Sequence, residues 1–142
     1  MFTREESKQI REQFWIFFGK RYPRKWLLYD TKVKEINLRF SFDNQKAVVS
    51  FDIETHDEVF REYYYDKFVS LKNLLKAEIS EDIILEKDFL RSSGKIISRV
   101  YITKHDVNIH NKKNWPEVFD FFYENMPKFE LFWYEYEDII KA

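Results

Sequence analysis

The chain has 142 residues, of which 44% are hydrophobic and 35% are charged, a composition typical of a folded domain and not of a disordered chain. The formal net charge of −1 argues against global electrostatic attraction to nucleic acid, and the absence of cysteine excludes disulfides, thiolate zinc sites and cysteine nucleophiles. The length predicts a single domain over residues 1–142.

Location and cofactors follow from what the sequence does not contain. No apolar run approaches membrane-spanning length, and the N-terminal stretch MFTREESKQIREQ has no signal-peptide core, so we expect a cytoplasmic, bacterial-type protein that does not contact a membrane. Glycine occurs only at positions 19 and 94, which excludes both the Walker loop and the dinucleotide-binding glycine motif. We therefore expect no cofactor.

The first predicted helix covers residues 3–18. Thr3 followed by Glu6 forms a capping-box pattern, and Gly19 suits the C-terminal cap. One face of this helix carries apolar residues at helical spacing: Ile10, Phe14, Phe17 and Phe18.

Two strands are predicted next, over residues 36–43 and 47–55. Both alternate strictly between apolar and polar residues, the pattern of a half-buried strand, and the turn sequence DNQK joins them into an antiparallel hairpin. Phe51 lies in the middle of the apolar face of the second strand, so we expect it in the main core. The polar face of that strand carries Asp52 and Glu54.

The second half of the chain repeats this order. A capping-box pattern of Thr55 and Glu58 opens a helix that is predicted to continue to about Ile79. Strands are predicted over 83–89 and 96–103, and they are joined through the sequence RSSGK. A final helix begins at Asn114, and the proline at position 127 is expected to kink it or split it.

The predicted order is α-ββ-α-ββ-α. Strands in which apolar and polar residues alternate suit an antiparallel sheet that has one face packed on helices. We therefore predict an α+β fold with a four-stranded antiparallel sheet and helices mainly on one face.

Long motifs, in order along nearly the whole chain, resemble a bacterial family known as domain of unknown function number 4268. The motifs are FWIFFGKRY at 14–22, WLLYDTKVK at 26–34, SFDIETHDEVFREYY at 50–64, GKIISRVY at 94–101 and VNIHNKKNWPEVFDFF at 107–122. The KVK at 32–34 departs from the glycine-containing form of the family. Family copies can follow a restriction-nuclease-like domain, so the resemblance implies an association with DNA processing and no catalytic residue of this domain.

The polar face of the sheet is the first candidate site, where charged residues from several strands can converge: Arg39, Asp52, Glu54, Glu86 or Asp88, and Arg99. Asp52 and Glu54 could share a metal ion, as nuclease carboxylates do. However, the nuclease pattern places a lysine two residues after the second acid, and here that residue is His56. We favour a solvated face with cross-strand ion pairs and no metal.

The second candidate is the basic and aromatic segment at 20–26, comprising Lys20, Arg21, Tyr22, Arg24, Lys25 and Trp26. Such a segment can bind phosphates and stack bases. Basic residues also suit the C-terminal end of a helix, and Trp26 can belong to the core, so we do not favour nucleic acid as the partner. The three histidines are expected in surface loops, although His105 and His110 lie near Asp106 in a pattern that could bind a metal.

The sequence therefore predicts a non-enzymatic accessory or interaction domain whose partner is a protein, either a second copy or another chain. Two alternatives are a divergent metal-dependent nuclease that uses Asp52 and Glu54, and a weak nucleic-acid-binding module that uses residues 20–26. The first alternative requires Asp52 and Glu54 to be available beside a basic cleft, whereas pairing with Arg39 and Arg99 would favour the non-enzymatic interpretation.

Overall fold

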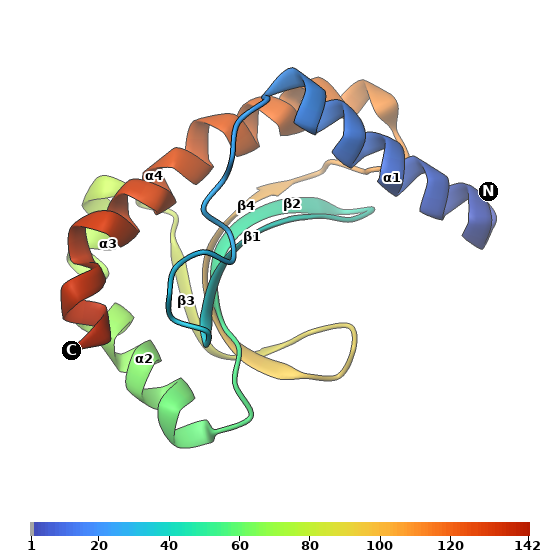
Figure 1. Cartoon of the computed structure of the whole chain (residues 1–142). Helices are drawn as coiled ribbons and strands as arrows, with labels where there is room; N and C mark the ends of the chain where they lie inside the picture. The colour runs from blue at the N-terminus through green and yellow to red at the C-terminus, as the bar shows by residue number, and fades with distance from the viewer. Residues whose placement is uncertain (1) are drawn as a thin grey trace.

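A computed structural model describes residues 2–142, and Figure 1 shows its elements. The sheet has four antiparallel strands in the order β1-β2-β4-β3, and it curls into an open arc. The helices lie along the outer, convex side of this arc, and the hairpin between β3 and β4 turns across its inner side (Figure 1). The α+β prediction is confirmed, with its order of elements. Within the described residues, no helix is long and apolar enough to cross a membrane.

The strands are β1 (Ile36–Phe42), β2 (Lys46–Ile53), β3 (Ile84–Leu90) and β4 (Ile96–His105). Their register sets which side chains share a face. Phe51 of β2 pairs with Leu38 of β1 and with Val100 of β4, so three apolar side chains lie in one row on the convex face. The next row, offset by one residue, joins Asn37, Asp52 and Arg99 on the concave face.

The main core lies between the convex face and the helices. Phe51 is fully buried there, as predicted, and its ring packs 5.0 Å from the ring of Phe68 and 5.1 Å from that of Phe129. Trp133 contributes a further aromatic neighbour to the same cluster. Large rings bury much apolar area per residue, which stabilises a domain of this modest size.

Helix α1 (Arg4–Arg21) begins with the predicted capping box between Thr3 and Glu6. The prediction that Gly19 caps its C-terminus is wrong, because the helix continues to Arg21 and ends with Tyr22 as its cap. The proline that follows Tyr22 cannot continue a helix, which explains why the end falls there.

The helix predicted from residue 55 to Ile79 is two helices, α2 (Glu58–Ser70) and α3 (Lys72–Glu78), which meet at Leu71. The predicted capping box of Thr55 and Glu58 is also wrong. Asp57 is the N-cap of α2, and its carboxylate accepts hydrogen bonds from the backbone N–H groups of Val59 and Phe60.

Helix α4 (Trp115–Lys141) follows a short 3-10 turn, η1 (Lys112–Asn114), and runs along the convex side of the sheet (Figure 1). It is not split at Pro127. Proline removes one backbone hydrogen bond, whereas the fully buried Met126 and Phe129 pack this part of the helix onto the core. Tertiary packing therefore outweighs the local effect of the proline.

Strand β2 is buried on both faces, so the prediction of a half-buried strand with a solvated polar face is wrong. Val48, Ser50 and Asp52, all on the concave face, are at most 2% exposed. Two features cover them: β2 lies between two neighbouring strands, and long arginine side chains extend over the concave face, one of them from the β3–β4 hairpin.

Candidate functional site

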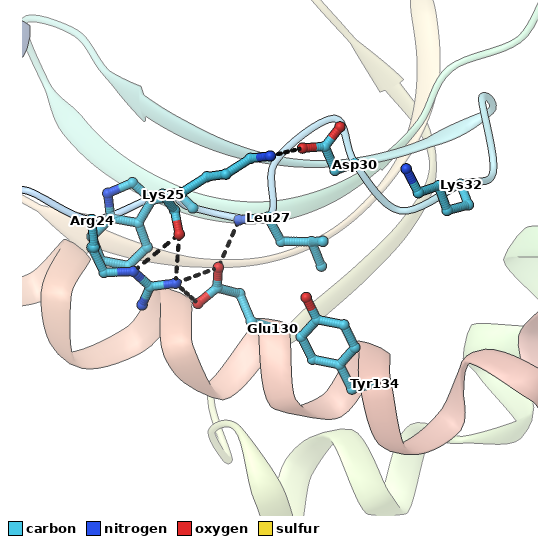
Figure 2. A pocket seen from close by; sticks show the side chains of 8 residues that line it. Arg24, Lys25, Leu27, Asp30, Lys32, Glu130 and Tyr134 are labelled. Carbon is cyan, nitrogen blue, oxygen red and sulfur yellow. Dashed lines mark hydrogen bonds and ion pairs between the residues drawn. The ribbon is translucent and has the colours of Figure 1, made fainter.

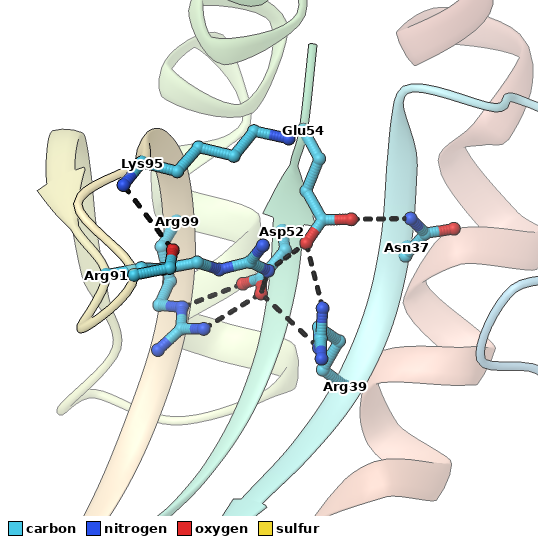
Figure 3. Close-up of polar contacts among 8 residues, drawn as sticks. Asn37, Arg39, Asp52, Glu54, Arg91, Lys95 and Arg99 are labelled. Atoms are coloured by element: carbon cyan, nitrogen blue, oxygen red, sulfur yellow. Dashed lines mark hydrogen bonds and ion pairs between the residues drawn. The ribbon is translucent and has the colours of Figure 1, made fainter.

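An ion pair between β2 and β4 forms the centre of the concave face. Asp52 and Arg99 are partners in the register, and the Arg99 Nε and Nη2 each donate a 2.8 Å hydrogen bond to one carboxylate oxygen of Asp52 (Figure 3). The Asp52 side chain is fully buried and that of Arg99 is 8% exposed. A buried carboxylate requires such charged donors, because it has lost its water.

Two further arginines complete the cluster. Arg91, just after the end of β3, donates from Nη2 to Asp52 at 2.9 Å and also to Glu54 (Figure 3). Arg39 of β1 donates from Nη1 to Glu54 at 2.9 Å, and its Nε lies 3.9 Å from Asp52. We call these five side chains, Arg39, Asp52, Glu54, Arg91 and Arg99, the arginine–carboxylate cluster.

Four of the residues predicted for this face are brought together: Arg39, Asp52, Glu54 and Arg99. The two remaining candidates are outside the cluster, although Glu86 is the partner of Arg99 in the register of β3 and β4 and lies on the same face. Glu86 accepts a 2.8 Å hydrogen bond from the Tyr101 hydroxyl, and Asp88 pairs with Arg61 of α2 at 3.1 Å. Sequence reasoning missed Arg91. The only feature of the sequence that pointed to Arg91 was its basic side chain in the RSSGK turn, which joins the predicted strands 83–89 and 96–103.

The environment of Arg91 is unusually rich in positive charge. Burial lowers the pKa of its guanidinium, the Asp52 carboxylate opposes this shift, and the nearby Arg39 and Arg99 lower the pKa further. The guanidinium of Arg99 also lies 4.2 Å from the ring centroid of Phe89, a cation–π contact that holds it against the hairpin. The cluster is therefore a group of three cations around two carboxylates.

A hollow of about 470 Å³ lies beside the cluster, between the sheet and the hairpin. Its lining is mainly polar and cationic, with a short apolar wall. The lining residues are Arg39, Ser41, Asp43, Lys46, Val48, Phe89, Leu90, Arg91, Ser92, Ser93 and Arg99.

The carboxylates of the cluster are poorly placed to bind a metal ion. Both oxygens of Asp52 already accept hydrogen bonds from arginine, and Glu54 accepts from Asn37, Arg39 and Arg91. A divalent cation would have to displace guanidinium groups from these oxygens. Within residues 2–142, no group of three or more His, Cys, Asp and Glu side chains is arranged to bind a metal.

The basic segment 20–26 is held by acidic partners on α4 and in its own loop (Figure 2). Arg24 donates from Nη2 to both carboxylate oxygens of Glu130 at 2.9 Å, and Glu130 also accepts from the backbone N–H of Leu27 at 2.7 Å. Lys25 lies 3.2 Å from Asp30. A pocket of about 340 Å³ adjoins these residues, and of its charged lining residues only Lys32 has no ion-pair partner within residues 2–142.

The two aromatic residues of the segment are also engaged. Tyr22 stacks on Tyr123 with ring centroids 4.2 Å apart, and its hydroxyl donates to Asp120. Trp26 packs against the rings of Phe18 and Phe40 and has Arg24 over its face at 3.9 Å. Lys20 and Arg21 lie in the last turn of α1 and have no carboxylate partner within the described chain.

The histidines do not form a cluster. His110 bonds to Asn108 and Ser7 through its ring nitrogens and stacks on Phe2, whereas His105 is exposed at the end of β4. His56 is exposed before α2. His110 is thus part of the packing between α1 and the loop before η1.

The fold and the site define a class of protein: a small α+β domain whose curved antiparallel sheet carries a buried arginine–carboxylate cluster on its open face. The chain belongs to the family described as domain of unknown function (DUF4268), whose model matches residues 10–137. No curated protein and no solved structure matches the chain. Lys32, the first residue of the KVK stretch at 32–34, adopts the left-handed conformation that favours glycine, with φ of 68°.

Proposed function

We propose that this domain is a non-enzymatic interaction domain that uses the concave face of its sheet to bind a partner. The observation that carries the proposal is the saturation of Asp52: both of its oxygens accept hydrogen bonds from arginine, at 2.8 to 2.9 Å. A catalytic carboxylate must be free to bind a metal or to move a proton. Asp52 instead positions arginines, whose remaining N–H groups are available to a ligand.

The alternative of a metal-dependent nuclease receives less support from the same geometry. Metal-dependent nucleases rely on a carboxylate-bound cation to stabilise the charge on phosphate. Here Asp52 and Glu54 are held by guanidinium groups, and the residue two positions after Glu54 is His56 where the nuclease pattern has lysine.

Titration calorimetry with Mg²⁺ and Mn²⁺ tests the proposal. We expect no binding tighter than about millimolar, because arginines occupy the oxygens that would bind the ion. The matched comparison is the variant Arg91→Gln, which removes one guanidinium from both carboxylates and should increase any residual affinity. Micromolar metal binding by the natural protein, abolished by Asp52→Asn and accompanied by cleavage of DNA or RNA, would overturn the non-enzymatic proposal.

The same proposal covers the biological setting. We propose an accessory role beside DNA-processing proteins in the bacterial cytoplasm, which is the setting that the family resemblance and the sequence led us to expect. Purification of the tagged chain from its native host, with Arg91→Gln as a control, tests this setting. Partners that co-purify only with the natural chain support a role for the concave face.

A further inference from the structure

We propose that the hollow beside the arginine–carboxylate cluster binds an organic phosphate. The phosphate group would lie among Arg39, Arg91 and Arg99, and the carbon part of the ligand would pack on Phe89 and Leu90. This inference rests on the proposed function, because it names a ligand that the concave face would bind.

The charge of the site favours an anion. Four cationic side chains line the hollow: Arg39, Lys46, Arg91 and Arg99. Three carboxylates lie at or beneath its surface: Asp43, Asp52 and Glu54. A fourth carboxylate, Glu86, is the register partner of Arg99 on the same face, but it accepts from the Tyr101 hydroxyl and does not line the hollow. A phosphomonoester carries about −1.5 to −2 at neutral pH, so it suits the four cations that line the hollow better than a neutral ligand does.

The donors that remain after the internal pairing are numerous. A guanidinium has five N–H groups, and Arg91 uses only its Nη2 toward the carboxylates. Within residues 2–142, no hydrogen bond to protein is made by the Nε and Nη1 of Arg91, the Nη2 of Arg39 or the Nη1 of Arg99. The two carboxylates fix the arginines in place and leave part of each fork for a second acceptor. A phosphate has three terminal oxygens, which suit several such forks at once.

The size and the walls of the hollow fit a small organic molecule. Its volume of about 470 Å³ lies within the range of ligand pockets, roughly 300–1,000 Å³. Val48, Phe89 and Leu90 form an apolar wall, and Leu90 is 65% exposed where the hairpin borders the hollow. An exposed leucine beside a cationic floor suits a ligand that has an anionic end and an apolar or aromatic body.

Phosphorus NMR and calorimetry at low ionic strength test this site, with thymidine 5′-monophosphate, thymidine and inorganic phosphate as probes. We expect the nucleotide to bind, inorganic phosphate to bind more weakly, and thymidine not to bind. Arg91→Gln should weaken nucleotide binding by about tenfold or more, since it removes charged hydrogen bonds. Lys46→Gln, at the rim of the hollow, should weaken it without altering the ion pairs of Asp52. Lys87→Gln is the matched control, because Lys87 lies on the same hairpin but pairs with Glu62 of α2.

Short oligothymidines with and without a 5′-phosphate identify the source of the phosphate. Tighter binding of the phosphorylated oligomer than of the mononucleotide would assign the site to the end of a nucleic acid chain. Exclusion of the oligomer would assign it to a free phosphorylated molecule.

Absence of nucleotide binding would overturn the phosphate site and leave the non-enzymatic proposal intact. The same holds if Arg91→Gln, Lys46→Gln and Lys87→Gln all bind the nucleotide equally well. Release of inorganic phosphate from a bound nucleotide would support the site but overturn the non-enzymatic proposal.

Discussion

Asp52 and Arg99 are direct neighbours across β2 and β4, and two parallel 2.8 Å hydrogen bonds join the fully buried carboxylate to the guanidinium. The pair lies on the opposite face of the sheet from Phe51, one residue earlier in the same strand. Strand β2 therefore positions the main core on one side and the candidate binding site on the other, and a change at either residue acts on the same structural element.

Asp52→Asn should lower the free energy of unfolding by about 3–5 kcal/mol, because it leaves the buried Arg99 without its counter-ion. Urea denaturation measures this change. Asp88→Asn is the control: Asp88 also pairs with an arginine, but its side chain is 64% exposed, and its loss should cost less than about 1 kcal/mol. Equal effects of the two substitutions would mean that the burial of Asp52 contributes nothing.

Phe51→Ala should lower the free energy of unfolding by about 3–5 kcal/mol, the sum of the lost transfer energy and the cavity that remains. Phe60→Ala on α2 is the matched control, because Phe60 is 52% exposed and its truncation leaves no closed cavity. Urea melts of both variants make the comparison. A loss below about 1 kcal/mol for Phe51→Ala would contradict the packing of this ring between sheet and helices.

The sequence was sufficient to predict the concave face in outline. In paired strands, successive side chains point to opposite faces, so the strand pattern determines which residues share a face. This rule placed Asp52 and Glu54 on one face with Arg39 and Arg99. Arg91 could not be found in this way, because it lies in a turn where no periodicity indicates the direction of a side chain. The burial of the face was equally hidden, since it depends on the curl of the sheet and on the path of the hairpin.

The helix errors have a similar origin. The apolar spacing continues through Leu71, so periodicity alone predicts one helix where the structure has two. At Pro127 the local rule predicted a kink or a split, and the helix is not split, because the buried neighbours Met126 and Phe129 pack it onto the core. The capping-box pattern was correct at Thr3 and Glu6 but wrong at Thr55 and Glu58, where Asp57 is the N-cap.

Ser50→Ala should raise the free energy of unfolding by about 0.5–1 kcal/mol. The Ser50 hydroxyl is fully buried on the concave face and has no hydrogen-bond partner in the described chain, and burial of an unpaired hydroxyl is unfavourable. Ser98→Ala is the control. Ser98 is equally buried, but its hydroxyl donates to the backbone carbonyl of Lys87 and accepts from Arg61, so its removal should destabilise the protein. Destabilisation by Ser50→Ala would contradict the unpaired state of this hydroxyl.

The Tyr101 phenol should remain protonated in the folded protein at pH values where free tyrosine ionises. Burial, followed by the hydrogen bond to Glu86 and its negative charge, raises the pKa of Tyr101 to about 12 from its ordinary value of 10.0. Because the folded pKa is the higher one, this contribution to stability is complete below about pH 10 and is lost as the pH rises through about 12.

Urea melts between pH 9 and 12 should therefore show a smaller alkaline loss of stability for Tyr101→Phe than for the natural protein. Tyr136 titrates in the same range, since its hydrogen bond to Glu78 raises its pKa to about 12, and Tyr136→Phe provides the baseline for that contribution. An unchanged alkaline profile in Tyr101→Phe would contradict the role of the Glu86 contact.

The basic segment at 20–26 should bind oligonucleotides without a terminal phosphate no more tightly than about 10 μM at physiological salt, the range of non-specific contact. Arg24 and Lys25 are paired with Glu130 and Asp30, which leaves Lys20 and Arg21 as the two cations able to contact phosphates. Each phosphate contact contributes a slope of about −0.7 to −0.9 to the dependence of log affinity on log salt, so the slope should not exceed about 2 in magnitude.

Fluorescence anisotropy with labelled single- and double-stranded oligonucleotides, at two salt concentrations, measures both the affinity and the slope. The informative variant is Lys20→Glu combined with Arg21→Glu, because it reverses the free charges and leaves the pair of Arg24 with Glu130 intact. Tyr22 and Trp26 are already stacked on protein rings, so base stacking on them would require the segment to rearrange. Submicromolar affinity that this double variant abolishes would contradict the prediction and would identify the end of α1 as a nucleic-acid-binding surface.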